Sequence, residues 1–184
     1  MSVLADRLIA VHDALTVARL PHAFGGAIAL AYCTGEPRGT RDLDVNIFVS
    51  PGRAKDVFAA LPGPVRTGAP ELRAAEREGQ VRVWWEDTPI DVFLDVHRFH
   101  RDVATGVRQV PFMGRSIPVL GCTALAVFKA LFNRTKDWAD IEAMVQDGSL
   151  DLADAALRVE HMAGADHPAV QRLQALSLGG PLSR

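Results

Sequence analysis

The most regular alternation of apolar and polar side chains in the chain is Asp42-Leu43-Asp44-Val45-Asn46-Ile47-Phe48-Val49. Because successive side chains of a β-strand point to opposite faces of the sheet, this segment is predicted to be a strand with one buried face. The apolar set consists of Leu43, Val45, Ile47 and Val49. The carboxylates of Asp42 and Asp44 then point away from the core on the same side, about 6–7 Å apart along the strand.

A second segment, Ile90–Val96, repeats this alternation with Asp91 on its polar face. If the two strands are neighbours in one sheet, Asp42, Asp44 and Asp91 converge on one small surface. Two carboxylates about 5 Å apart repel by about 3 kcal/mol at an effective dielectric constant of about 20, so the cluster requires water, raised pKa values or a divalent cation. Oxygen ligands alone favour Mg²⁺ or Mn²⁺ over zinc. The alternative is that each amphipathic strand only presents its polar face to solvent.

The composition excludes several classes of protein. The 184 residues suit one domain, with or without a small helical appendix, and 48% of them are hydrophobic, which excludes a disordered chain. The 20 basic and 22 acidic residues give a net charge of −2, which excludes a generically basic nucleic-acid coat. The longest segment free of charged residues, Leu20–Gly35, contains Pro21 and is too short to span a bilayer, so no membrane association is expected.

The two cysteines and the N-terminus indicate a cytoplasmic protein. Cys33 and Cys122 are too few for a disulfide scaffold and stand in apolar surroundings, so they are predicted to be buried thiols in a reducing compartment. Asp6 and Arg7 occupy the region where a signal peptide would need an apolar core.

The periodicity of the remaining chain predicts mainly helices around the strands. Helices are expected at Val3–Leu20, Ala27–Tyr32, Gly52–Leu61 and Pro70–Glu78, and one long helix at Thr123–Asp147. A loop is expected at 62–68, strands at 80–86 and 89–96, and a hairpin at 107–119. The helical structure after Ser149 gives way to a loose tail from Gly179. The predicted fold class is α+β (α/β), with a mixed sheet of about five strands flanked by helices and a helical C-terminal part.

A glycine pair precedes the acidic strand. The chain reads Phe24-Gly25-Gly26-Ala27-Ile28-Ala29-Leu30 and then Arg38-Gly39-Thr40-Arg41-Asp42-Leu43-Asp44. This pattern resembles the nucleotidyltransferases of the DNA polymerase beta superfamily, most closely the minimal bacterial branch with antibiotic nucleotidyltransferases and abortive-infection-type toxins. Pro89-Ile90-Asp91-Val92-Phe93 matches the element with the family's third carboxylate. Lys129 to Asp140 looks like the Lys…Arg…Asp-x-x-Asp helix of the toxin-like branch.

The resemblance implies a nucleotidyltransferase fold with a core at residues 1–120 and a helical region at 121–184 packed on it. The implied reaction transfers a nucleoside monophosphate from an NTP to a hydroxyl acceptor with release of pyrophosphate. Asp42, Asp44 and Asp91 would be catalytic and hold Mg²⁺ or Mn²⁺. The residues implied to bind the nucleotide are Gly25, Gly26, Arg38, Thr40, Lys129 and Lys136. Two departures stand out, since many members have Gly-Ser and 15 residues separate Gly26 from Asp42.

Several alternatives stay open at the level of sequence. The acceptor is a small molecule, a tRNA end or a protein hydroxyl. A catalytically degenerate binding module, or a toxin–antitoxin interaction protein with an antitoxin partner, is the alternative function. Lys129 and Lys136, seven residues apart on the predicted long helix, either reach phosphates or form a solvated face with a Lys136–Asp140 pair. Roles near the site are also considered for Asp95, His97, His100, Asp137, Trp84 and Trp85.

Overall fold

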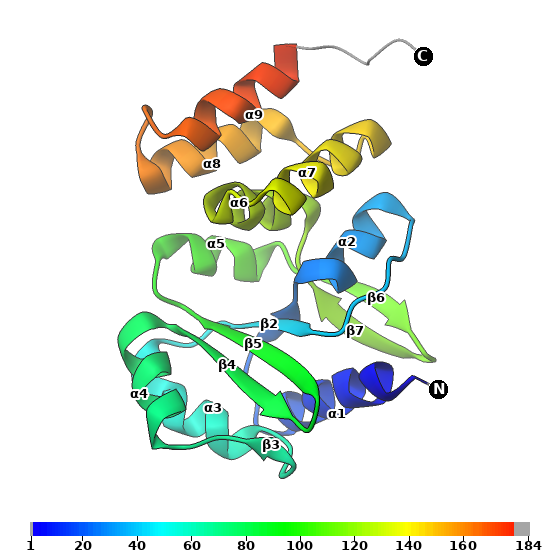
Figure 1. The fold of residues 1–184 in the computed structure, drawn as a ribbon, viewed down its shortest axis with the longest axis vertical. Coiled ribbons are helices and arrows are strands. Elements are labelled where there is room, and N and C mark those ends of the chain that lie inside the picture. The colour runs from blue at the N-terminus through cyan, green and yellow to red at the C-terminus, as the bar shows by residue number, and fades with distance from the viewer. Residues whose placement is uncertain (1, 179–184) are drawn as a thin grey trace.

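The computed structural model describes residues 2–178, which form a seven-stranded mixed sheet with helices on both faces (Figure 1). The strands are β1 (His22–Phe24), β2 (Leu43–Ile47), β3 (Val65–Arg66), β4 (Gln80–Trp85), β5 (Thr88–Leu94), β6 (Arg108–Phe112) and β7 (Arg115–Val119). Their order across the sheet is β3-β4-β5-β2-β1-β7-β6, with β2–β5 and β1–β7 parallel and the other pairs antiparallel. The α+β class is confirmed, with more strands than the five predicted.

The helices lie in two layers. They are α1 (Val3–Val17), α2 (Gly26–Thr34), α3 (Ala54–Ala60) after the 3₁₀ turn η1 (Pro51–Arg53), α4 (Ala69–Glu78), α5 (Arg98–Thr105), α6 (Cys122–Phe132), α7 (Thr135–Asp147), α8 (Leu152–Ala163) and α9 (Pro168–Leu178). Figure 1 shows α1, α3 and α4 on one side of the sheet, and α2, α5 and the stack of C-terminal helices on the other. The division at residues 120/121 stays a prediction, and the tail predicted from Gly179 lies outside the described residues.

The register between the two acidic strands confirms the prediction from their alternation. In the parallel β2–β5 pair, Asp44 lies opposite Asp91, and Val45 lies opposite Val92. Val45, Ile47, Val92 and Leu94 are at most 1% exposed. Shifting either strand by one residue would turn carboxylates into this apolar layer, so burial of the layer fixes the face on which the acids lie.

The predicted single helix at Thr123–Asp147 is wrong, because the chain breaks it between α6 and α7. Asn133 ends α6 in the left-handed conformation with φ 54°, which asparagine adopts more readily than most residues. Arg134 is extended, and the Asp137 side chain accepts a hydrogen bond from its backbone N–H, which caps α7. Lys129 and Lys136 therefore lie on different helices and share no helix face.

Two short elements were missed by the sequence reasoning. Strand β3, in the segment predicted to be a loop, has only two residues, too few to show an alternation. Helix α5 was not predicted, although Phe99 and Val103 are spaced by one turn and both buried. The side chain of His97 accepts a hydrogen bond from the backbone N–H of Phe99 and so caps this helix.

The prediction of two free thiols is also wrong. Cys33 at the end of α2 and Cys122 at the start of α6 form a disulfide, with their Cα atoms 5.6 Å apart. The two residues are 89 positions apart, and packing of α2 against α6 brings them together. The cysteines thus give no argument for a reducing compartment, and the cytoplasmic location stays a prediction. Among residues 2–178, no helix combines the length and apolar character needed to cross a membrane.

Candidate active site

A cavity of about 520 Å³ lies where the acidic face of the sheet meets α2, α6 and α7. Its walls include eight of the nine predicted site residues: Gly26, Arg38, Thr40, Asp42, Asp44, Asp91, Lys129 and Lys136. The ninth, Gly25, lines a smaller cavity beside it. The fold thus brings together residues that the sequence separates by up to about a hundred positions.

Asp42 and Asp91 are close enough to Asp44 to affect its ionisation. Burial, followed by the charges of Asp42 and Asp91, raises the pKa of Asp44 to about 6. The positive charges of Lys129 and Lys136 act in the opposite direction and are too weak to cancel this effect. Negative charge is therefore concentrated around Asp44, where the two-strand pattern predicted the acids to converge.

Two of the carboxylates already have partners. The Thr40 hydroxyl donates a hydrogen bond to Asp42, and Arg82 donates from Nε and Nη2 to the two oxygens of Asp91 at 2.7 and 2.6 Å. Sequence reasoning missed Arg82. The β4–β5 hairpin gives the signal that could have found it, because pairing outward from its turn places Arg82 directly opposite Asp91.

The chemistry of this donor set fits Mg²⁺ or Mn²⁺, since all three side chains offer carboxylate oxygens. Their arrangement is looser than a finished ligand set: in the part of the chain that the structure describes, no three His, Cys, Asp or Glu side chains are grouped as a metal site. In this arrangement Asp91 is paired with Arg82. The residues fit a divalent ion if Asp91 exchanges its guanidinium partner for the metal.

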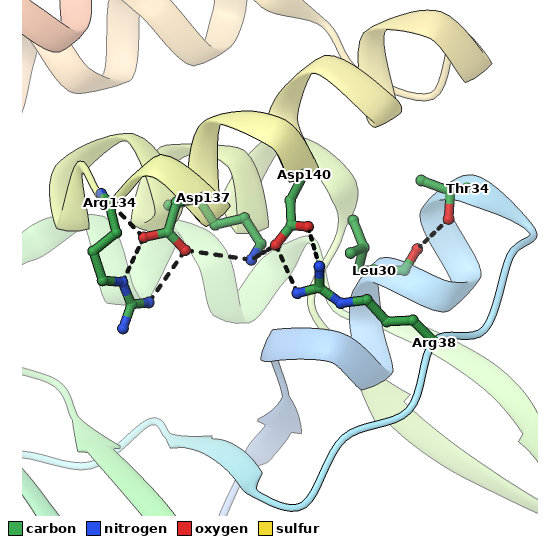
Figure 2. Close-up of polar contacts among 7 residues, drawn as sticks. Leu30, Thr34, Arg38, Arg134, Asp137 and Asp140 are labelled. Atoms are coloured by element: carbon green, nitrogen blue, oxygen red, sulfur yellow. Dashed lines mark hydrogen bonds and ion pairs between the residues drawn. The ribbon is translucent and has the colours of Figure 1, made fainter.

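Asp140 orients two cations at the rim of the cavity. This α7 residue is 3% exposed and accepts hydrogen bonds from Arg38 at 2.6 and 2.9 Å, as Figure 2 shows. It also accepts a hydrogen bond from Lys129 Nζ at 2.6 Å. A buried carboxylate on α7 thus fixes one cation from the loop before β2 and another from α6.

Asp137, one turn earlier on α7, plays a similar part. It is fully buried and accepts two hydrogen bonds from the Arg134 guanidinium, at 2.6 and 3.1 Å (Figure 2), and its Oδ1 lies 3.6 Å from Lys129 Nζ. Burial tends to raise the pKa of Asp137, but the hydrogen bond from Arg134 and the charges of Lys129 and Arg134 outweigh it and hold that pKa below its usual value.

The two lysines have different environments. Lys129 is 6% exposed and paired with Asp137 and Asp140, so the solvated-face interpretation is wrong for it. Lys136 is exposed, lines the cavity and forms no ion pair within residues 2–178. The alternative Lys136–Asp140 pair is not formed, because Asp140 binds Arg38 and Lys129 instead.

The glycine pair brings the backbone at the start of α2 into contact with Asp44. Gly25 is the N-cap of α2, and its N–H donates to the Asp44 carbonyl oxygen at 2.8 Å. Gly26 has φ +51°, and a Cβ atom there would lie 1.9 Å from Oδ2 of Asp44. A serine at position 26 would collide with Asp44 in this arrangement, which gives a physical reason for Gly-Gly.

The other residues considered from sequence lie outside this cavity. Asp95, His97 and His100 line neither the large cavity nor the smaller one. Trp85 packs against the core under the Arg7 guanidinium, whereas Trp84 is 42% exposed on the polar face of β4.

Comparison with known proteins gives structural relatives only. No protein-family model matches the sequence, and no curated protein matches it. The crystal structure of ANT(2'')-Ia in complex with adenylyl-2''-tobramycin aligns with a TM-score of 0.62 at 14% identity, over 95% of this chain and 98% of that one. The solution structure of the antibiotic-resistance factor ANT(2'')-Ia aligns with a TM-score of 0.61 at 11% identity, over 95% of both chains.

A further similar structure is an antigenic nucleotidyltransferase-like protein from Paracoccidioides brasiliensis. It aligns with a TM-score of 0.55 at 14% identity, over 97% of this chain and 89% of that one. These likenesses extend over nearly the whole chain. The chain therefore has a nucleotidyltransferase fold.

Proposed function

We propose that the protein is a metal-dependent nucleotidyltransferase that transfers a nucleoside monophosphate from an NTP to a hydroxyl acceptor. The observation that supports this most is the convergence of Asp42, Asp44 and Asp91 on a cavity with an opposing rim of cations. In the reaction, the acceptor oxygen bonds to the α-phosphorus and loses its proton, while the bond from that phosphorus to the pyrophosphate oxygen breaks.

The three carboxylates would hold the divalent ions. Bound Mg²⁺ or Mn²⁺ supplies charge neutralisation at the α-phosphate and makes the acceptor hydroxyl more acidic. The raised pKa of Asp44 supports this assignment, because a buried carboxylate beside two others favours binding of either a proton or a cation.

The cations would hold the triphosphate. Arg38, held by Asp140, and Arg134, held by Asp137, are about half exposed, so their free N–H groups can face a ligand. Lys136 offers a compact ammonium that no described residue neutralises. The backbone at the start of α2 is open to phosphate because Gly25 and Gly26 have no side chains.

Three classes of hydroxyl acceptor are candidates. A small hydroxyl compound is supported by the fold similarity to ANT(2'')-Ia, whose complex contains adenylylated tobramycin. A tRNA end and a protein hydroxyl are the other candidates.

A degenerate binding module, with or without an antitoxin partner, is the second candidate. The observation that favours it is the Arg82–Asp91 pair, which occupies one of the three carboxylates.

The test combines binding and turnover. Isothermal titration with each NTP in Mg²⁺ should show binding that Asp42→Asn abolishes, and radiolabelled NTP should label tRNA, an aminoglycoside or the protein itself. Asp56→Asn is the matched control, because Asp56 is an exposed α3 carboxylate paired with Arg53. NTP binding without transfer of the nucleotide to any acceptor favours the degenerate module. Equal NTP affinities of Asp42→Asn and Asp56→Asn contradict both proposals.

A further inference from the structure

A second, smaller cavity adjoins the carboxylates on the side away from Asp42. Its volume is about 50 Å³, and it shares Gly26, Asp44, Lys129, Arg134 and Asp137 with the larger cavity. Its remaining walls are mostly apolar, from Phe93 on β5, Leu120, and the α6 residues Leu125, Phe128 and Phe132. The proposed triphosphate and metal site therefore continues into an aromatic slot.

One polar side chain enters this slot. Asn46 follows Asp44 by two residues on β2, so it points from the same face of the sheet, about 7 Å further along the strand. It is 4% exposed and lines the slot, and its side-chain amide makes no hydrogen bond with any residue from 2 to 178. Buried amides in folded proteins nearly always bond a protein group or a water, so an amide that faces a cavity without a protein partner is available to a ligand.

Two aromatic rings lie at the mouth of the slot. The rings of Phe93 and Phe132 have centroids 6.0 Å apart and planes inclined by 54°, and Phe132 is 43% exposed at the end of α6. The Arg134 guanidinium lies 5.0 Å from the Phe132 centroid. Aromatic side chains and guanidinium groups stack on the faces of planar rings, whatever the chemical identity of the ring. The slot is too small for a whole acceptor molecule but admits the edge of one ring.

We propose that this slot is the nucleobase subsite of the NTP, with Asn46 bonded to the edge of the base and Phe132 against its face. The inference rests on the proposed function and adds the placement of the nucleoside. The amide of Asn46 offers a donor and an acceptor side by side, which complement adjacent groups on a base edge, as in the pairing of asparagine with adenine. The ribose then bridges the distance between Asp44 and Asn46, and the triphosphate extends towards the cations on the Asp42 side.

The experiment compares ATP with inorganic tripolyphosphate, which carries the same phosphates without a base. Dissociation constants for both are measured in Mg²⁺ by isothermal titration, on the wild type and on Asn46→Leu, which replaces the amide by an apolar group of the same branched shape. ATP should bind the wild type more tightly than tripolyphosphate does. Asn46→Leu should weaken ATP binding about tenfold and leave tripolyphosphate binding unchanged.

A second variant guards against misfolding of a buried substitution. Phe132→Ala changes an exposed residue at the mouth and should weaken ATP binding several-fold without affecting tripolyphosphate. Leu157→Ala is the matched control, since Leu157 is an apolar α8 residue that is 50% exposed and lines neither cavity.

Each other outcome overturns the inference. Equal weakening of ATP and tripolyphosphate would make Asn46 a residue that only positions Asp44. Unchanged ATP binding in both variants, or a change confined to the KM for the acceptor, would show that the base does not bind in the slot. A wild type that binds neither ATP nor tripolyphosphate would refute the proposed function itself, which distinguishes the two failures.

Discussion

Arg82 and Asp91 face each other across the β4–β5 pair and form two hydrogen bonds, at 2.7 and 2.6 Å. The guanidinium thus neutralises one of the three carboxylates proposed to hold the metal. The pair lies at the edge of the cavity, with Arg82 half exposed. Because the guanidinium is half exposed and Asp91 lines the cavity, a divalent cation can reach this carboxylate and displace Arg82.

Removing this competitor should strengthen metal binding. Arg82→Gln should tighten Mg²⁺ binding by about two- to fivefold, because Asp91 no longer has to leave a guanidinium partner. Titration calorimetry with Mg²⁺ measures this change. Arg66→Gln is the matched control on the neighbouring strand β3, where the guanidinium bonds only the Glu86 carbonyl. Weaker Mg²⁺ binding in Arg82→Gln than in the control would mean that Arg82 supports the metal site.

The raised pKa of Asp44 predicts a dependence of stability on pH. The folded protein binds the Asp44 proton more tightly than the unfolded chain, so ionising this carboxyl destabilises the fold as pH rises from about 4 to about 6. A rise from 3.8 to about 6 corresponds to at most about 3 kcal/mol. Asp44→Asn should therefore have a larger free energy of unfolding than the wild type at pH 8 without metal. This advantage over the wild type should be smaller at pH 4. Urea unfolding at both pH values measures the difference, and an equal difference at the two pH values would contradict the prediction.

Gly26 should tolerate no side chain. Gly26→Ala should destabilise the protein by more than about 1 kcal/mol, because φ +51° is unfavourable for alanine and its Cβ would lie 1.9 Å from Oδ2 of Asp44. Gly35→Ala is the matched control, since Gly35 has φ +67° and a Cβ atom there would meet nothing within 4 Å. The excess cost of Gly26→Ala over Gly35→Ala in thermal or urea unfolding measures the collision. Equal costs would show that Asp44 moves aside freely.

Asp140 should be essential for the cationic rim. Asp140→Asn should lower the free energy of unfolding by about 3 kcal/mol, because it leaves the buried Lys129 with one distant partner, Asp137. Glu142→Gln is the control, an exposed α7 residue whose carboxylate lies 3.9 Å from Arg172. Chemical unfolding of both variants provides the comparison. If Asp140→Asn were as stable as Glu142→Gln, Lys129 would not depend on this pairing.

The disulfide should stabilise the fold through its long covalent loop. Closing a loop of 89 residues restricts the unfolded chain by about 4–5 kcal/mol in the chain-entropy model. A reducing agent should therefore lower the urea midpoint of the wild type. It should not change that of the double variant Cys33→Ser, Cys122→Ser. Two titratable thiols in the native, unreduced protein would contradict the bond.

The alternation of residues along the chain was enough to predict the carboxylate face. Period two in Asp42–Val49 and Ile90–Val96 places acids and aliphatic residues on opposite sides, and burying both aliphatic sets fixes the face on which the acids lie. The nucleotidyltransferase fold was predicted from the resemblance of the glycine pair and the acidic strand to a known family. The carboxylate face depends on local periodicity and on the cost of burying a carboxylate, both of which can be read from sequence.

The partners of the charged residues depended on contacts between distant elements. Nothing near Asp140 in the sequence shows that it binds Arg38, 102 positions away, and nothing near Cys33 shows that it bonds Cys122. The break at Asn133, which separates Lys129 from Lys136, depended on one residue adopting the left-handed conformation, and the hydrogen bond from Trp138 Nε1 to Asn133 Oδ1 supports it. A charged side chain is compatible with many partners of opposite sign, and packing of α2, α6 and α7 against the sheet selects among them.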